Sequence, residues 1–166
     1  MDDDPTTRVD TTPIKENDMS TLTGLTTMVL TADDVAAAAD WYADVLGISP
    51  YFRQPPEGEP AYIEFRIGPD EDELGIMSRA FAPEGTAPGG SSVTYWHVDD
   101  VDATLGDLVS RGAAVHAPVT SRGEEFVTAS VIDPFGNVLG LMHSPHWARR
   151  HRSPGELRAG HPAKVP

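Results

Sequence analysis

The sequence contains no cysteine, which excludes disulfide frameworks, thiolate nucleophiles and cysteine-based metal sites. It also lacks any apolar run approaching the roughly 18 residues that a transmembrane helix needs. The first residues, MDDDPTT, have neither the basic start nor the apolar stretch of a secretory signal peptide. These absences predict a cytoplasmic protein that does not bind a membrane.

Positive charge is scarce, since 12 Lys and Arg stand against 26 Asp and Glu, for a net charge of −14. A chain this acidic repels a phosphate backbone, so we do not expect nucleic acid as a partner. The charge favours solubility, and it can also attract a cationic ligand. With 166 residues, 39% of them hydrophobic, the chain is large enough for one domain with a core of its own.

The two ends differ in composition from the middle. Residues 1–20 are polar, include Pro5 and Pro13, and are expected to form a disordered lead. Residues 146–166 contain most of the arginines of the last third and are expected to form a basic C-terminal tail. The folded domain is therefore predicted to span 21–145.

An internal repeat is the most informative feature of that domain. The segment 31–35 (TADDV) reappears at 97–101 as HVDDV, an offset of 66. The pieces IGP and LGIM of 67–77 reappear in 132–142 as IDP and LGLM, an offset of 65. Agreement of order and register predicts two related modules, 24–80 and 92–145, joined by the Gly- and Pro-rich stretch 80–91.

Each module shows the same order of expected elements. In the first, a strand over 26–32 precedes a helix that starts after Asp34 and ends at Gly47. In the second, a strand over 93–98 precedes a helix between Asp100 and Gly112. Three strands follow each helix, near 51–53, 61–67 and 74–79 and near 114–118, 126–132 and 138–143. The pattern predicts an α+β protein built from two βαβββ modules.

Three motifs carry a family resemblance, in order and on the repeat: residues 34–47 with Trp41-Tyr42 and Val45-Leu46-Gly47, residues 98–101 (VDDV) and residues 133–137 (DPFGN). With them, residues 24–145 resemble the vicinal oxygen chelate superfamily, also called the glyoxalase / bleomycin-resistance / extradiol dioxygenase family. The resemblance implies a curved mixed sheet with helices on one face and a small-molecule cup on the other. It also implies a homodimer, because the family commonly pairs modules across its sheet edges.

Members of this family that are enzymes usually hold a divalent metal in the cup through His, Glu or Gln. Counting from the repeat anchors, the four corresponding positions here are Thr27, Gly75, Val93 and Gly140, and none is a normal ligand of a divalent metal. We therefore predict that the metal site is absent and that no cofactor is bound. A metal at other positions, built from His97, His143 and His146, is the alternative.

Strand alternation supplies the candidate ligand-binding residues. In 62–67, Ile63, Phe65 and Ile67 are expected to face the helix, which turns their neighbours toward the cup. The same parity applies to the strand near 93–98, and one aromatic residue after the last strand can cap the cup. The candidates are Tyr62, Glu64, Arg66, Tyr95, His97 and Trp147. Glu64 and Arg66 can alternatively pair with each other at an exposed sheet edge.

These observations favour a small-molecule-binding protein that sequesters an organic ligand without the usual metal. Two alternatives stay open: a lyase, isomerase or dioxygenase with a metal at non-standard positions, and a metal-free enzyme that uses His97 or Glu64 as acid/base.

Overall fold

The first module is a four-stranded sheet covered by one helix. The computed structural model describes residues 25–84, 93–123 and 125–151. In the first module, β1 (Thr27–Ala32), β2 (Phe52–Gln54), β3 (Tyr62–Ile67) and β4 (Asp72–Ser78) pair in the order β1-β4-β3-β2. The helix α1 (Val35–Leu46) connects β1 to β2, and a short 3₁₀ turn, η1 (Arg79–Phe81), follows β4. Strand β1 runs parallel to β4, while the other pairs are antiparallel.

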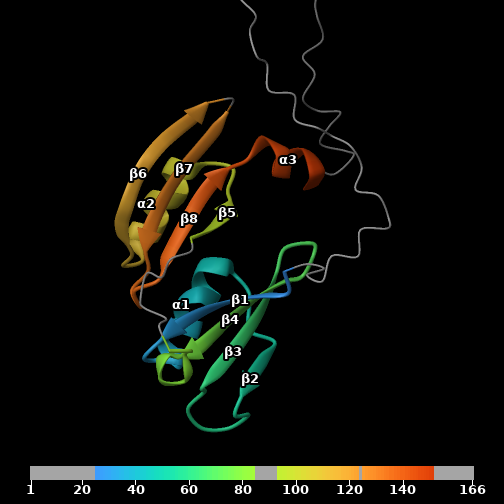
Figure 1. Ribbon diagram of the computed structural model, residues 1–166, viewed down its shortest axis with the longest axis vertical. Coiled ribbons are helices and arrows are strands. Elements are labelled where there is room, and N and C mark those ends of the chain that lie inside the picture. Colours follow the sequence, from blue (N-terminus) through green and yellow to red (C-terminus); the bar gives the residue numbers. More distant parts are fainter. Residues whose placement is uncertain (1–24, 85–92, 124, 152–166) are drawn as a thin grey trace, which may run out of the picture.

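The second module repeats this topology. It contains β5 (Thr94–His97), α2 (Val101–Ser110), β6 (Ala114–Gly123), β7 (Phe126–Ile132) and β8 (Val138–His143), with strand order β5-β8-β7-β6. Strand β5 is parallel to β8, as β1 is to β4. A third helix, α3 (Pro145–His151), follows β8 and lies beyond the ends of β5 and β8 (Figure 1). The predicted α+β class and the two βαβββ modules are confirmed.

The two long helices begin and end where the sequence places their caps. Asp34 accepts a hydrogen bond from the Ala37 N–H, and Asp100 accepts one from the Ala103 N–H, both at 2.9 Å. Gly47 ends α1 with a positive φ of 67°, a conformation that favours glycine. The repeated Asp-Asp sequence therefore sets the start of the helix in each module.

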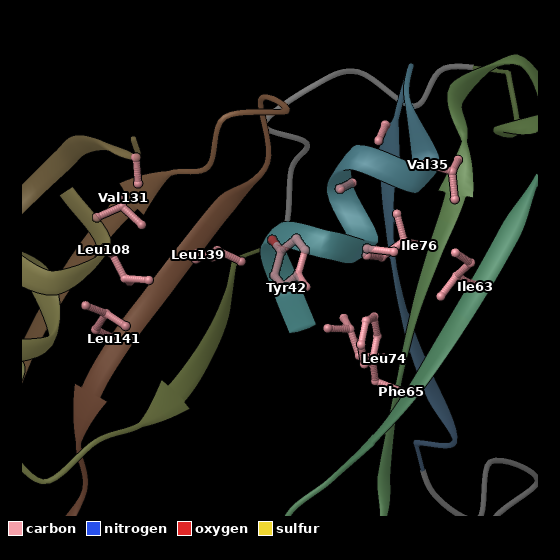
Figure 2. Close-up of a cluster of buried hydrophobic side chains, with 14 of the residues drawn as sticks. Val35, Tyr42, Ile63, Phe65, Leu74, Ile76, Leu108, Val131, Leu139 and Leu141 are labelled. Atoms are coloured by element: carbon pink, nitrogen blue, oxygen red, sulfur yellow. The ribbon is translucent and has the colours of Figure 1, made fainter. Parts of the chain in front are cut away.

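The core lies between each sheet and its helix. On β3, Ile63 and Phe65 are buried, as the alternation predicts. Figure 2 shows these side chains with Leu74 and Ile76 of β4, facing Val35 and Tyr42 of α1. In the second module Leu108, Val131, Leu139 and Leu141 form the equivalent group (Figure 2). We call the opposite face of each sheet, which neither α1 nor α2 covers, the open face.

Polar contacts join the two modules through α1 and the turn 133–137, with α1 lying between its own sheet and the second module (Figure 1). The buried Tyr42 hydroxyl donates to the buried Asp133 carboxylate at 2.7 Å. The Asn137 side-chain amide bonds both the N–H and the C=O of Thr31 on β1, at 3.2 and 3.1 Å. Trp41 donates to the Arg111 carbonyl at 2.8 Å. The DPFGN motif thus forms the joint between the modules.

The structure tests only part of what the sequence predicts for the two ends of the chain. The disordered lead lies outside the described residues, as does most of the basic tail. The first residues of that tail, however, form α3. None of the described helices is both long enough and apolar enough to cross a bilayer. The cytoplasmic location stays a prediction.

Candidate functional site

The open face of the first module carries a connected group of polar and aromatic side chains. Tyr62, Glu64 and Arg66 project from β3 away from the buried Ile63 and Phe65, as strand parity predicts. Glu73 joins them from β4, where it lies opposite Arg66 in the antiparallel register. Alternation along two neighbouring strands therefore gathers two carboxylates and a guanidinium on one face.

Tyrosine hydroxyls hold the two carboxylates of this face. Glu64 accepts hydrogen bonds from Tyr51 at 2.6 Å and from Tyr62 at 2.7 Å. The Tyr51 hydroxyl also lies 3.0 Å from Glu73, which accepts a hydrogen bond from Thr27 at 2.9 Å. A hydroxyl has only one proton to donate, so Tyr51 cannot satisfy both carboxylates at once. The carboxylates of Glu64 and Glu73 can therefore accept further hydrogen bonds.

The electrostatics follow from these contacts. The hydrogen bond to Glu64, with smaller effects of burial and of Glu73, raises the pKa of Tyr51 to about 12. Burial, followed by the hydrogen bond to Glu64, raises the pKa of Tyr62. Hydrogen bonds from Thr27 and then Tyr51 lower the pKa of Glu73. At neutral pH both tyrosines are therefore neutral donors and Glu73 is ionised.

Arg66 does not pair with Glu64. Its guanidinium carbon lies 4.1 Å from the centroid of the Tyr51 ring, a cation–π arrangement. Within the described chain, no ion pair joins Arg66 to either carboxylate of the face. The alternative of a simple Glu64–Arg66 pair is therefore wrong, because the tyrosine hydroxyls occupy Glu64 and the Tyr51 ring holds the guanidinium.

A tyrosine ring lies over each of the two glycines at the positions that the family resemblance singles out. At Gly75, an added Cβ would lie 2.8 Å from ring carbons of Tyr62. At Gly140, it would lie 2.6 Å from Cδ1 of Tyr95. Real side chains do not approach so closely, so each glycine leaves the space that the tyrosine ring occupies. The space above Gly140 is filled by aromatic carbon of Tyr95, and the space above Gly75 by the hydroxyl and ring carbons of Tyr62.

The open face of the second module holds the other predicted residues. Tyr95 and His97 project from β5 on this face, while Trp96 packs toward the core. Tyr95 is 46% exposed. His97 is enclosed, because the Trp147 ring of α3 stacks on it at 4.3 Å between centroids and 23° between planes. Trp147 therefore lies against His97, and its role as a cap on a ligand cup stays a prediction.

The six predicted residues form two groups, Tyr62, Glu64 and Arg66 on the first module and Tyr95, His97 and Trp147 on the second. Across the described ranges, no hydrogen bond, ion pair or ring contact joins the two groups. A pocket of about 220 Å³ lies elsewhere, between the Ala36, Ala39 and Asp40 side of α1 and Arg53 of β2. The single shared pocket expected for these residues stays a prediction.

Comparison with known proteins supports one assignment. Residues 24–141 match the profile of the family described as "Glyoxalase/Bleomycin resistance protein/Dioxygenase superfamily". The chain belongs to this superfamily. No curated protein sequence shows a significant match to it.

Solved structures of the superfamily share this fold at low identity. A superfamily member from Sphaerobacter thermophilus is 19% identical, with a TM-score of 0.60 over 73% of this chain and 97% of its own. TioX from Micromonospora sp. ML1 is 19% identical, with a TM-score of 0.56 over 72% and 98%. Lactoylglutathione lyase from Agrobacterium tumefaciens is 18% identical, with a TM-score of 0.56 over 75% and 96%. At these identities the likeness shows the fold alone.

The superfamily implies a divalent metal, but the residues at its four positions do not fit one. Gly75, Gly140 and Val93 offer no side-chain donor atom, and both glycines lie beneath tyrosine rings. The Thr27 hydroxyl is bonded to Glu73. The alternative set His97, His143 and His146 is not assembled either. In the ranges that the structure describes, no group of three or more His, Asp or Glu is arranged to hold a metal.

Sequence reasoning missed Tyr51 and Glu73 as members of the first group. The signal for Glu73 was available, because alternation over 72–78 places Glu73, Gly75 and Met77 on one face. Tyr51 opens the strand expected near 51–53, but β2 begins at Phe52, so Tyr51 lies just before the strand and its place depends on tertiary folding.

Proposed function

We propose that this protein binds a small organic molecule on the open faces of its sheets, without a divalent metal at the superfamily's positions. One observation carries the proposal: the network of Tyr51, Tyr62, Glu64 and Glu73 is built on the face that no helix covers. Structural carboxylates commonly pair with Lys or Arg, whereas these two are held by neutral hydroxyls beside exposed rings. Such a surface is suited to recognising a ligand.

The groups of the face indicate the chemistry of that ligand. Tyr51 and Phe52 are each 45% exposed, and Phe52 together with the Tyr51 ring face opposite Arg66 offers a surface for stacking. Glu64 and Glu73 can accept further hydrogen bonds, most strongly from a charged donor. The net charge of −14 favours the approach of a cation. We therefore propose a planar or aromatic molecule that carries an amine or amidine-like group.

We further propose that the functional unit is a homodimer. Strands β1 and β5 each lie at the edge of their sheet, with a neighbouring strand on one side only. Exposed apolar and aromatic side chains lie on or beside them, including Val29, Val93 and Tyr95. A second copy of the chain packed on these strands would place the open face of its second module opposite the open face of the first module in the other copy. This arrangement would unite the two groups of predicted residues.

The decisive experiment screens the full chain by native mass spectrometry and ligand-observed NMR against fractionated extracts of its own cells. Elemental analysis is made on the same sample. We expect one organic molecule bound and no stoichiometric zinc, iron, nickel or manganese. Tyr95→Ala, His97→Ala and Glu64→Gln should each weaken binding by roughly fivefold, about 1 kcal/mol for one lost hydrogen bond or ring contact. Glu59→Gln, an exposed carboxylate outside the open face, is the matched control.

Three outcomes would count against the proposal. About one metal ion per chain would contradict the metal-free assignment. Normal binding by all three open-face variants would place the site elsewhere, with the 220 Å³ pocket beside α1 as the next location to examine. Turnover of the bound molecule that survives EDTA would instead indicate a metal-free enzyme with His97 or Glu64 as acid/base.

A further inference from the structure

Helix α3 is held on the second module by a column of three aromatic rings. Trp147 stacks on His97 of β5 at 4.3 Å on one side and on His151 at 4.0 Å and 20° on the other. The stack leaves the His97 side chain only 7% exposed. His151 in turn reaches Asp70, in the β3–β4 turn of the first module, at 3.0 Å. The helix thus covers one end of the second open face and is tied to the first module.

The hydrogen bonds require opposite protonation states for the two histidines. The Ser144 backbone N–H donates to Nδ1 of His97 at 3.1 Å, so this nitrogen carries no proton. His151 faces acceptors at both nitrogens, the Trp147 carbonyl 2.9 Å from Nδ1 and the Asp70 carboxylate 3.0 Å from Nε2. Both of its nitrogens must carry protons to make these bonds. The docked helix therefore needs a neutral His97 and a charged His151.

We propose that α3 is a pH-gated cap on the open face of the second module, docked only while His97 is neutral and His151 is charged. Protonation of His97 places two N–H groups against each other at Ser144, and deprotonation of His151 removes one of its two bonds. Either change weakens the column and exposes His97. This inference does not depend on which ligand the open face binds.

The other ionisable groups around the column fit this assignment. His143 lies 5.4 Å from His97 between ring centroids, and the fully exposed Asp99 lies 3.7 Å from its Nε2. Burial, followed by His143, lowers the pKa of His97, and this outweighs the solvent-screened Asp99. On α3 itself, Arg150 opposes the charge of His151 only weakly. His146 and Arg149 contact each other and stand outside the stack.

The signs of the two shifts define a window of pH. The pKa of His97 is lowered, so its contribution to docking is present above about 6.5 and is lost as the pH falls through the lowered value. Hydrogen bonds to the Trp147 carbonyl and then to Asp70 raise the pKa of His151. Its contribution is present below about 6.5 and is lost as the pH rises through the raised value. Docking is therefore strongest in a window that includes pH 6.5.

NMR of the full chain without ligand tests the cap. Long-range ¹H–¹⁵N spectra report the protonation of each imidazole nitrogen, and the indole resonances of Trp147 report docking. From about pH 5 to about pH 9, Trp147 should show a plateau that ends in one transition at each side. On the plateau, His97 should carry its proton on Nε2 alone and His151 should carry two.

Two variants assign the transitions to the proposed groups. Asp70→Asn should move the upper transition down by roughly half a pH unit, as expected for the loss of one exposed carboxylate partner, and leave the lower one in place. His97→Gln keeps an acceptor for Ser144 but cannot titrate, so it should abolish the lower transition. Asp72→Asn, at the start of β4 next to this turn and without a side-chain hydrogen bond or ion pair to any described residue, should change neither.

Several results would overturn the cap. One is a single Trp147 transition near pH 6.5 that Asp70→Asn does not move. Another is a His97 that carries its proton on Nδ1 while Trp147 is docked. If His97→Gln undocks the helix at every pH, the test rests on the unmodified chain. A His97 whose Nδ1 carries no proton while Trp147 is docked then supports the cap, and a proton on Nδ1 overturns it.

Discussion

Tyr42→Phe is the sharpest test of the joint between the modules. The substitution removes one hydroxyl and leaves the ring in place, in a site where Tyr42 is 2% exposed and Asp133 is 3% exposed. The Asp133 carboxylate loses one of four donors and keeps the Phe135 N–H, the Asn137 N–H and the Asn137 side-chain amide. Loss of a hydrogen bond to a charged group costs about 1.5–3 kcal/mol.

That free energy converts to a melting shift that is easy to measure. The described part of the chain has about 120 residues, and an unfolding entropy of roughly 2.1 cal/mol/K per residue gives about 4 °C per kcal/mol. Tyr42→Phe should therefore lower the Tm by about 6–12 °C in calorimetry, with a matching loss in urea unfolding. Tyr95→Phe is the matched control, because the Tyr95 hydroxyl has no hydrogen bond within the described residues. Its effect should stay within about 0.5 kcal/mol.

Equal and small effects of the two Tyr→Phe changes would refute the reasoning. They would mean that the bond between Tyr42 and Asp133 adds nothing beyond packing. A large effect of Tyr42→Phe on the urea slope as well as on the midpoint would show that the modules unfold separately once the joint is weakened.

Three further predictions follow from the open faces. Gly140→Ala should destabilise the fold by about 1 kcal/mol in urea unfolding, because the new Cβ meets the Tyr95 ring, and Tyr95→Ala in the same chain should restore most of the loss. Thr27→Val should lower the Tm at pH 7, and the difference should vanish as the pH falls through the lowered pKa of Glu73, because the protonated carboxyl no longer needs that donor. Light scattering at micromolar concentrations should give the mass of two chains, and a monomer throughout would contradict the proposed dimer.

Much of the fold could be predicted from the sequence, because its signals are local and occur twice. The Asp-Asp caps at 33–34 and 99–100 precede both helices, and strands β7 and β8 have the predicted bounds 126–132 and 138–143. Alternation also assigned Ile63 and Phe65 to the core and Tyr62 and Glu64 to the other face. Because the same order of elements occurs in both modules, the assignment of each element could be compared with that of its counterpart.

The parts that could not be predicted depend on contacts between distant residues. The bond between Tyr51 and Glu64 depends on how the turn before β2 folds back on β3. The sequence did not predict α3 at the start of the basic tail, because this segment is charged and has no apolar stripe. The contact that stabilises α3 is one indole between two imidazoles. Strand parity gives the face of a side chain and says nothing of its partner, which is why Arg66 was associated with Glu64 and not with Tyr51.

In this protein the residues that join the two modules and the residues proposed to bind a ligand lie in different places. The bonds of Asp133 and Asn137 hold the halves of the molecule together on the side of α1, away from the open faces. Substitutions on those faces can therefore accumulate without loosening this joint. A scaffold arranged in this way can change what it recognises while its architecture stays intact, and the same property makes its open faces a rational place to install new specificity.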